Sequence, residues 1–474
     1  MVPYYGKAGM YMENMNQEVP RRRPVRRKKT KWQIFKEAYL PTVILAVTVI
    51  LIIWFIIGGA VRRNSQETVP TDPPAPSTEA TNLASRYQEQ ASELLVRAAA
   101  AAENYDYEDA VTILSSFEGN MADFPALQSA YNEYVTIINE MVVWNDPSQI
   151  PTLSAHMLIA DAHLAYNDTQ YGSSYRKNFI TTDQFRDILD QLYANDCVLV
   201  DLMDVYDEQF DEATGKTAYV PRELLLPAGK QPILLVQTQV NYYQYMLNGA
   251  KDNLPDGFAS KLCVDENGQF YNEMPLADGS SVTGAYDLVP ILEQFIEENP
   301  MFSYHGARAI LAVSGYEGLF GYRVSSTSLS EEDLAMEEAE AAKLCAALQD
   351  RGYRIACYTY SNIDYGSQGA SKIQEDLQKW EDKILPMLGE YGCEILVYAR
   401  EADIADKDAD YSGSKFNVMY NAGYRFFMSA SSAGYSQIGD QYVRHDRLCI
   451  TGEYLSKYPE RFEGLFDPFS LTVQ

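Results

Sequence analysis

The feature that most constrains the fold of this chain is an alternation of short apolar runs with amphipathic segments in its C-terminal part. The runs are rich in leucine, β-branched and aromatic residues, as strands are. They lie at residues 152–158, 197–202, 232–236, 309–313, 354–357, 395–398 and 424–428. Strands that alternate with helices usually pair in parallel, with the helices covering the sheet. The pattern therefore predicts an α/β fold with a parallel sheet.

Several of the intervening segments carry helix signals. Thr181 stands three residues before Gln184, a spacing typical of a capping box, and predicts a helix that runs to Tyr193. Ser330 indicates a second helix start. A third helix is indicated by apolar side chains on one helical face, namely Ile373, Leu377, Trp380 and Ile384. In contrast, the Asn-Gly pair within residues 262–270 predicts a hairpin turn.

An uncharged apolar segment occupies residues 40–61. It is long enough to cross a hydrocarbon core of about 30 Å, and it lacks the small-residue cleavage site of a removable signal peptide. Basic residues crowd segment 21–31 before it, whereas only two arginines follow directly. By the positive-inside rule, the sequence predicts a cell-membrane protein with a basic cytoplasmic tail at 1–38, one transmembrane helix at 39–61 and an extracellular remainder.

The segment after the apolar run predicts a spacer. Residues 62–81 are rich in Pro, Thr, Ser and Glu, as linkers are. The pattern from 82 to 144 is helical, with an alanine-rich stretch followed by apolar residues at helical spacing. Residues 103–110 resemble a degenerate tetratricopeptide turn, but one unit is too short for a repeat array. The sequence therefore predicts a helical stalk at 82–146 that carries a main domain at 150–474.

The charge changes sign along the chain. The first 63 residues hold 12 Lys and Arg against 3 Asp and Glu, and the rest hold 26 against 63. A strongly acidic surface repels polyanions, so no nucleic-acid partner is expected.

The six cysteines occur singly, mostly in apolar strand or helix contexts. This distribution predicts buried free thiols rather than a disulfide framework or a thiolate metal site. The extracellular location nevertheless leaves disulfides open as an alternative.

Four segments share motif patterns with a known family. The first, residues 232–243, has the character of a buried strand that runs into a loop. The others lie at 302–308, 315–323 and 442–447. From Pro151 to the C-terminus, the chain resembles the membrane-anchored polysaccharide deacetylases of Gram-positive bacteria, which form carbohydrate esterase family 4. The resemblance implies an irregular seven-stranded (β/α) barrel of the polysaccharide deacetylase type, with its site at the C-terminal strand ends.

Deacetylases of this family bind a divalent metal through one aspartate and two histidines, and a second aspartate deprotonates the attacking water. The resemblance places Thr238 and Gln239 at the aspartate pair, and Tyr358 and Asn362 at the histidines. These four side chains are uncharged and are poor ligands for zinc-like ions. The family's later Pro-x-Gly segment is replaced by residues 399–401. We therefore expect a pseudoenzyme without catalytic residues, bound metal or other cofactor.

Further side chains of the matching motifs are expected around the mouth of the barrel. Tyrosine rings suit the apolar faces of sugars, and Arg or Asn donors suit their hydroxyl edges. The candidate substrate-binding residues are Asn241, Tyr242, Tyr243, Arg323, Tyr358, Tyr398, Arg400 and Arg444. The sequence thus predicts an extracellular domain that binds a cell-wall glycan without hydrolysing it.

Two other interpretations stay open. An active carbohydrate deacetylase, acting on C–N amide bonds through a non-standard site, would need relocated carboxylates, for which Glu401, Asp403 and Asp364 are the candidates. A purely structural envelope protein would instead use the stalk to bind a protein partner of unknown identity.

Three residues around the end of the first predicted strand also suggest a metal site. His156, Asp161 and His163 lie close together in the sequence. However, the two histidines are seven residues apart, which is not a standard chelating spacing. A histidine that orients a loop is the favoured interpretation.

Overall fold

The computed structural model describes residues 78–167, 169–213, 215–249, 254–430 and 434–472. Apart from Thr78, the first residue of α3, the elements below belong to one compact unit, Glu79–Gln474. The predicted tail and transmembrane helix lie outside the described residues, as does most of the predicted linker. Within the described part of the chain, no helix combines the length and the apolar character needed to cross a membrane.

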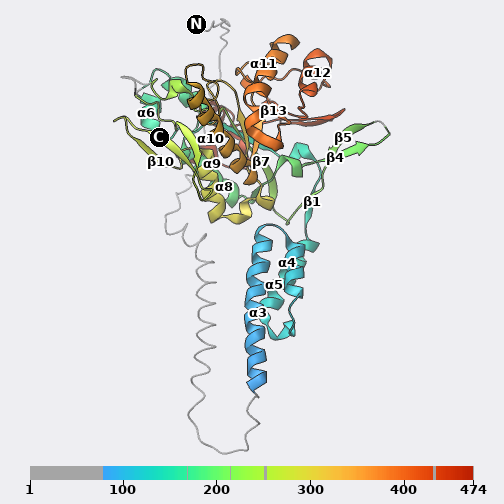
Figure 1. Cartoon of the computed structure of the whole chain (residues 1–474). Helices are drawn as coiled ribbons and strands as arrows, with labels where there is room; N and C mark the ends of the chain where they lie inside the picture. Colours follow the sequence, from blue (N-terminus) through green and yellow to red (C-terminus); the bar gives the residue numbers. More distant parts are fainter. Residues whose placement is uncertain (1–77, 168, 214, 250–253, 431–433, 473–474) are drawn as a thin grey trace, which may run out of the picture. The chain divides into compact units, whose positions relative to one another are not determined.

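The predicted stalk region folds into three helices, drawn in blue to teal in Figure 1: α3 (Thr78–Glu103), α4 (Tyr107–Ser115) and α5 (Pro125–Asn139). The buried residues of α3 recur three or four positions apart, which places them on one helical face. They are Ala91, Leu94, Ala98 and Ala102. The Tyr105 hydroxyl donates a hydrogen bond of 2.7 Å to the Met301 carbonyl oxygen. This bond ties the helical region to the main domain.

The last residues of the predicted helical pattern form a strand instead. β1 (Val142–Trp144) pairs antiparallel with β6 (Leu224–Leu226). Valine and tryptophan favour extended backbone, and the partner strand supplies the hydrogen bonds that a helix would otherwise provide. The helical prediction for 142–144 is therefore wrong, because pairing with a distant strand overrides local periodicity.

A curled, mostly parallel sheet forms the centre of the main domain. Each of the seven predicted apolar runs contains one of its strands, so the predicted α/β class is confirmed. Along the sheet the order is β15 (Ser436–Gly439), β16 (Tyr442–His445), β14 (Phe426–Met428), β13 (Ile395–Val397), β12 (Arg354–Cys357), β11 (Ile310–Val313), β7 (Gln231–Thr238), β2 (Thr152–His156) and β17 (Leu448–Cys449), while β3 (Cys197–Leu199) pairs with β7. β15 runs antiparallel to β16, and the other pairs are parallel.

The sheet curls because one segment near the end of the chain pairs with both of its sides. β16 lies beside β14, and two residues later β17 lies beside β2. The break between β16 and β17 falls at Asp446 and Arg447, both buried. The predicted count of seven strands stays a prediction.

Helices pack against one face of the sheet, and Figure 1 shows α8 to α11 beside β7 and β13. Strand residues such as Leu235 and Leu311 form one apolar cluster with helix residues such as Ile188 and Trp380. Alternate strand residues belong to a second cluster, which also contains the buried side chains of α3 to α5. The helices of the main domain are α6 (Ala162–Asn167), α7 (Gly172–Asn178), α8 (Thr182–Ala194), α9 (Leu288–Glu298), α10 (Glu331–Asp350), α11 (Ala370–Lys383), α12 (Gly413–Asn421) and α13 (Gly452–Lys457).

The helix signals of the sequence are confirmed. The Thr181 hydroxyl accepts from the Gln184 amide and the Gln184 side chain accepts from the Thr181 amide, so both halves of the capping box form. The Ser330 hydroxyl caps α10 by accepting from the Asp333 amide. On α11, the predicted apolar face is buried at Ile373, Leu377 and Trp380.

Two antiparallel hairpin units lie outside the central sheet. β8 (Lys261–Val264) and β9 (Phe270–Pro275) form the predicted Asn-Gly hairpin, and β10 (Ser281–Gly284) extends it. A second hairpin, β4 (Tyr206–Asp211) with β5 (Lys216–Pro221), has no counterpart in the predictions and extends outward in Figure 1. All six cysteines are free, and five of them are buried.

Candidate functional site

The loops at the carboxyl ends of four neighbouring strands share an unusual backbone geometry. Eleven described non-glycine residues have a positive φ, and seven of them follow β7, β11, β12 or β13. The seven are Gln239, Tyr242, Glu317, Phe320, Thr359, Asn362 and Arg400. Such conformations cost about 1–3 kcal/mol each and cluster where loops are held in shape for a function. In parallel α/β sheets this edge is also where sites are built.

A small polar cluster occupies the ends of β2 and β7. His156 and Thr238 lie side by side on these paired strands, and His156 Nδ1 is 2.6 Å from Thr238 Oγ1. The Gln239 amide nitrogen lies 3.4 Å from the same ring nitrogen. An imidazole that carries its proton on Nε2 accepts from both side chains through Nδ1. Burial, together with the charge of Arg447, lowers the pKa of the His156 imidazole to about 4, so the ring is neutral near pH 7.

These residues do not fit the divalent metal that the sequence resemblance implies. His156 is one imidazole, and its partners are a hydroxyl and an amide, whereas zinc-like ions favour thiolate, imidazole and carboxylate. Tyr358 and Asn362, at the implied histidine positions, add no such ligand. Within the described residues, no group of three or more His, Cys, Asp and Glu side chains is arranged to hold a metal ion.

A buried cation lies in the same region. Arg447 is 2% exposed, and its guanidinium donates to the Ser154 hydroxyl at 2.9 Å and to the Tyr398 carbonyl oxygen at 3.3 Å. Its charge lowers the pKa of His156, as described above. A positive charge that disfavours a protonated imidazole also disfavours a metal cation at that imidazole.

One buried carboxylate supports the loop after β7 from behind. Asp287 caps α9 and accepts four hydrogen bonds, from the Gln237 side chain at 2.6 Å, the Tyr242 hydroxyl at 2.7 Å, and the amides of Leu158 and Leu288 at 3.0 and 2.9 Å. Burial raises the pKa of this carboxyl above its ordinary value. All four bonds are internal, so Asp287 has a structural role.

The three predicted substrate-binding residues after β7 are almost fully buried. Asn241 donates to the Ser314 and Gly318 carbonyl oxygens at 2.7 and 2.5 Å and therefore joins two loops. Tyr242 points to Asp287. Tyr243 stacks on Tyr245, with ring centroids 5.8 Å apart and an interplanar angle of 16°.

The next three predicted residues hold the backbone of neighbouring loops or lie in the interior. Arg323 is half-buried and donates to the Tyr242 and Glu317 carbonyl oxygens at 2.7 and 3.0 Å. Tyr358 and Tyr398 are buried, and the Tyr398 hydroxyl lies 2.9 Å from that of Tyr411.

Arg444 and Arg400 differ in exposure. Arg444 is 1% exposed and forms an ion pair of 2.8 Å with Asp403, while it also donates to the carbonyl oxygens of Ala405 and Ala409. Arg400 is exposed, and its Nε donates to the Asn362 carbonyl oxygen at 3.2 Å. Among the eight candidates, Arg400 is therefore the one with an exposed side chain.

A cavity of about 500 Å³ opens beside the His156 cluster, between α7 and the loop after β7. Its aromatic walls are Tyr171, Tyr175, Phe179 and Tyr245. Its polar lining consists of His156, Ser174, Asn178 and Gln239. A concavity that combines aromatic walls with several fixed polar groups can hold a small ligand.

The sequence predictions missed the two exposed rings that line the cavity. Tyr171 is 36% exposed and Tyr245 is 40% exposed, and their ring centroids are 5.7 Å apart at 73°. Tyr245 lies only two residues beyond Tyr243. Tyr171 is the N-cap of α7, and its spacing from Ser174, Tyr175 and Asn178 places all four on one helical face, a signal that the sequence did carry.

The carboxylates proposed for an alternative hydrolase do not form an accessible pair. The Asp403 carboxylate forms an ion pair with Arg444 and accepts a hydrogen bond from the Tyr411 hydroxyl at 2.5 Å. Asp364 accepts from the Ser367 amide at 3.1 Å within its own turn. The side chain of Glu401 lies outside the described residues. Asp161 caps α6 by accepting from the amides of His163 and Leu164, so it orients a loop.

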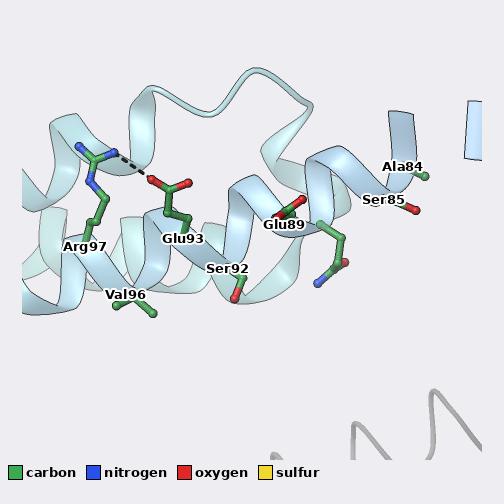
Figure 2. Close-up of a pocket in the computed structure, with 8 residues that line it drawn as sticks. Ala84, Ser85, Glu89, Ser92, Glu93, Val96 and Arg97 are labelled. Carbon is green, nitrogen blue, oxygen red and sulfur yellow. Dashed lines mark ion pairs between the residues drawn. The ribbon is translucent and has the colours of Figure 1, made fainter. Parts of the chain in front are cut away.

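A further hollow, of about 1000 Å³, runs along α3 and is shown in Figure 2. Its lining comes from one face of this single helix and includes an ion pair between Glu93 and Arg97 at 3.7 Å. Val96, on the same face, is 69% exposed. A shallow hollow with one wall has no converging polar groups and does not have the form of a small-ligand site.

Comparison with known proteins gives a likeness in structure but not in sequence. No protein-family model matches the chain, and no curated protein sequence matches it. The deacetylase PplD of Streptococcus pyogenes, solved in complex with acetate, is 10% identical with a TM-score of 0.33, and the match covers 66% of this chain and 94% of that one. A de-N-acetylase of Aggregatibacter actinomycetemcomitans is 11% identical with a TM-score of 0.36, covering 67% and 99%. A polysaccharide deacetylase of Bacillus cereus is 10% identical with a TM-score of 0.34, covering 69% and 70%. These similar solved structures are all deacetylases.

Proposed function

We propose that the main domain binds a cell-wall glycan at the cavity beside His156 and does not hydrolyse it. The observation that carries the proposal is the coincidence of two features at one edge of the sheet. The cavity offers accessible tyrosine rings. The adjoining strand ends carry a neutral His–Thr–Gln cluster.

The ring arrangement supports sugar binding. A pyranose presents an apolar face of C–H groups and an edge of hydroxyls, and protein sites meet these with aromatic walls and a few polar side chains. Tyr171 and Tyr245 meet at 73° and form a corner with both rings partly exposed. Ser174, Asn178 and Gln239 supply donors and acceptors around it.

The chemistry of the strand ends supports binding without hydrolysis. Amide hydrolysis needs an activated water, which requires a metal or a base. Thr238 and Gln239 supply neither, and the pKa of His156 lies at about 4 because the ring is buried near Arg447. An imidazole with that pKa is too weak a base to compensate for the missing groups.

The proposed location of the domain rests on the sequence alone. The uncharged run at 40–61 and the basic segment before it support a single membrane span with the main domain outside the cell. In that topology the main domain lies on the side of the membrane where the cell wall is. Seven strands are obtained when β16 and β17 are counted as one strand and the edge strand β15 and the side strand β3 are left out, a count that supports the seven-stranded barrel.

The test is a pull-down of the purified full chain with insoluble peptidoglycan and with chitin, followed by calorimetry with soluble oligosaccharides. We expect retention of the wild type and clear loss with Tyr171→Ala and Tyr245→Ala. Tyr391→Ala is the matched control, because Tyr391 is 62% exposed and lies outside the cavity. Failure of every glycan to bind the wild type would refute the proposal.

Two further measurements separate this function from an active deacetylase. Acetate release from N-acetylated oligosaccharides should equal the rate without protein. Metal analysis after dialysis against zinc, cobalt or nickel should find well under one ion per chain. Stoichiometric metal together with acetate release would favour the hydrolase instead.

A further inference from the structure

Among the residues that the structure describes, the lining of the cavity beside His156 includes no lysine or arginine. Its lining has aromatic, hydroxyl and amide groups plus the single imidazole of His156. Because the pKa of that imidazole is about 4, the cavity wall carries no positive charge near pH 7. An anionic ligand would find no partner there, whereas a neutral or cationic one meets no opposing charge.

Two acidic residues lie immediately behind the wall. Glu317 accepts from the Gln244 amide at 2.6 Å, next to Tyr245. Asp256 accepts from the hydroxyl of Tyr175, a wall residue, at 2.6 Å. Together with burial, the charges of Glu317 and Asp256 raise the pKa of the Tyr245 hydroxyl to about 12. The two carboxylates therefore contribute negative potential at the cavity, alongside the opposing charge of Arg447 at the His156 ring.

Arg323 is a cation close to this group, but it does not cancel the acidic charge. Both Glu317 and Glu337 raise the pKa of Arg323 against the lowering effect of its burial. The guanidinium donates to backbone oxygens of Tyr242 and Glu317 rather than into the cavity. Lys261 pairs with Glu337 at 3.7 Å, so Arg323 is left opposite Glu317, and Asp256 is a further acidic group.

The rings are placed to use that potential. Tyr171 and Tyr245 meet edge to face with centroids 5.7 Å apart, and Tyr243 stacks behind Tyr245 at 5.8 Å. The face of a tyrosine ring is negative, and it attracts ammonium groups within about 6 Å of the centroid. Several such faces backed by carboxylates are the general form of an ammonium-binding aromatic cage.

We propose that the cavity walled by Tyr171 and Tyr245 selects a ligand that carries an organic ammonium group. The free amine of a de-N-acetylated sugar and the quaternary amine of choline share this chemistry. The inference rests on the proposed glycan-binding function for its location. It adds a preference: the charged amine is bound better than the neutral acetamide of the same sugar.

Calorimetry on the purified full chain tests this preference near pH 6, where the amines are charged. The ligands are a glucosamine tetramer, an N-acetylglucosamine tetramer, choline and a glucuronate oligomer. We expect the glucosamine tetramer to bind about tenfold more tightly than its acetylated form, and the glucuronate oligomer not to bind. Choline binding would add support for the ammonium site, and its absence beside tight glucosamine binding would assign the site to amino sugars.

Variants separate the charge from the ring. Glu317→Gln keeps an acceptor for the Gln244 amide and removes one negative charge, so the preference for the charged amine should fall about threefold while affinity for the acetylated tetramer is unchanged. Tyr245→Ala should lower the affinity for every cationic ligand about tenfold. Glu390→Gln, an exposed carboxylate outside the cavity, is the charge control.

The outcomes distinguish the two proposals. Equal affinity for the two tetramers, with both lost in Tyr245→Ala, would overturn the ammonium preference and keep glycan binding. Choline binding with no oligosaccharide binding would keep the ammonium site and count against the glycan. No binding of any ligand would overturn both.

Discussion

The Arg444 guanidinium forms an ion pair with the Asp403 carboxylate at 2.8 Å, and the two side chains are only 1% and 12% exposed. Arg444 also lies against the rings of Tyr411 and Tyr435, 4.5 and 5.1 Å from their centroids. Its Nη1 and Nη2 groups also donate to the carbonyl oxygens of Ala409 and Ala405, whereas its Nε has no partner among the described residues. This one arginine therefore fixes the whole loop after β13.

Removing Arg444 should destabilise the protein strongly. Arg444→Met leaves the Asp403 carboxylate buried and unpaired, and breaking a buried pair in this way costs about 3–5 kcal/mol. The free energy of unfolding from urea titrations of the full chain measures the loss. Arg400→Met is the control, because Arg400 is exposed and has one hydrogen bond. A loss below about 1 kcal/mol for Arg444→Met would contradict this role.

Asn241 should hold the loop after β7 against the loop after β11. Asn241→Ala removes two donated bonds, to Ser314 and Gly318, and the bond accepted from the Ser314 amide at 3.1 Å. A buried amide and carbonyl left without partners cost about 1–3 kcal/mol each. We expect a lower thermal midpoint and faster hydrogen exchange around residues 314–318. Unchanged exchange there would show that the loop is held by other contacts.

Replacing Asp287 by a side chain with fewer hydrogen-bond acceptors should destabilise the protein. Asp287→Asn replaces one accepting oxygen with a donating amide, while Gln237, Tyr242 and two backbone amides all still donate. The clash of donors should cost about 3 kcal/mol in the free energy of unfolding. Asp350→Asn serves as a control on an exposed site at the end of α10. Equal stability of the two variants would exclude Asp287 as the organising group.

Stability should fall in mild acid because of His156 and His445. Burial lowers the pKa of both imidazoles from 6.5 to about 4. Between these pH values the unfolded chain binds protons that the folded chain does not, so stability is full above about pH 6.5 and is lost as the pH falls toward 4. Unfolding midpoints in urea from pH 7 to pH 4.5 measure the slope.

His445→Gln gives the matched comparison. The glutamine amide can replace Nε2, which lies 3.1 Å from the Ile150 carbonyl oxygen, but it does not titrate. The loss of stability between pH 6.5 and pH 4.5 should therefore shrink relative to the wild type. An identical slope in the variant would assign the acid sensitivity to other groups.

The sequence predicted the regular elements better than the accessible site. The seven predicted strands, the Thr181 cap and the Asn-Gly hairpin were correct, because each depends on local periodicity or turn chemistry. The strand β1 was missed because its pairing with β6 joins residues far apart in the sequence. Short local windows carry no information about such a partner.

The site residues show a different limit. The expectation that site residues follow a strand end correctly predicted the loop of Asn241, Tyr242 and Tyr243. It did not indicate on which side of the backbone each side chain lies. The positive φ at Tyr242 turns its ring toward Asp287 rather than toward solvent. Tyr171 was missed because it lies at the start of α7, outside the motifs that matched the family. Exposure depends on tertiary packing, which a motif does not encode.

The pairing of β16 with β14 and of β17 with β2 has a consequence for how the chain is made. The first and last strands of the domain meet only after almost the entire chain has been synthesised, so the contacts that complete it span a very long sequence separation. Such topologies fold slowly and leave unpaired strand edges exposed in the meantime. A nascent chain that stops before Leu448 would leave the edge of β2 unpaired. Pairing of β17 with β2 is therefore the step that removes this aggregation-prone edge from the newly made protein.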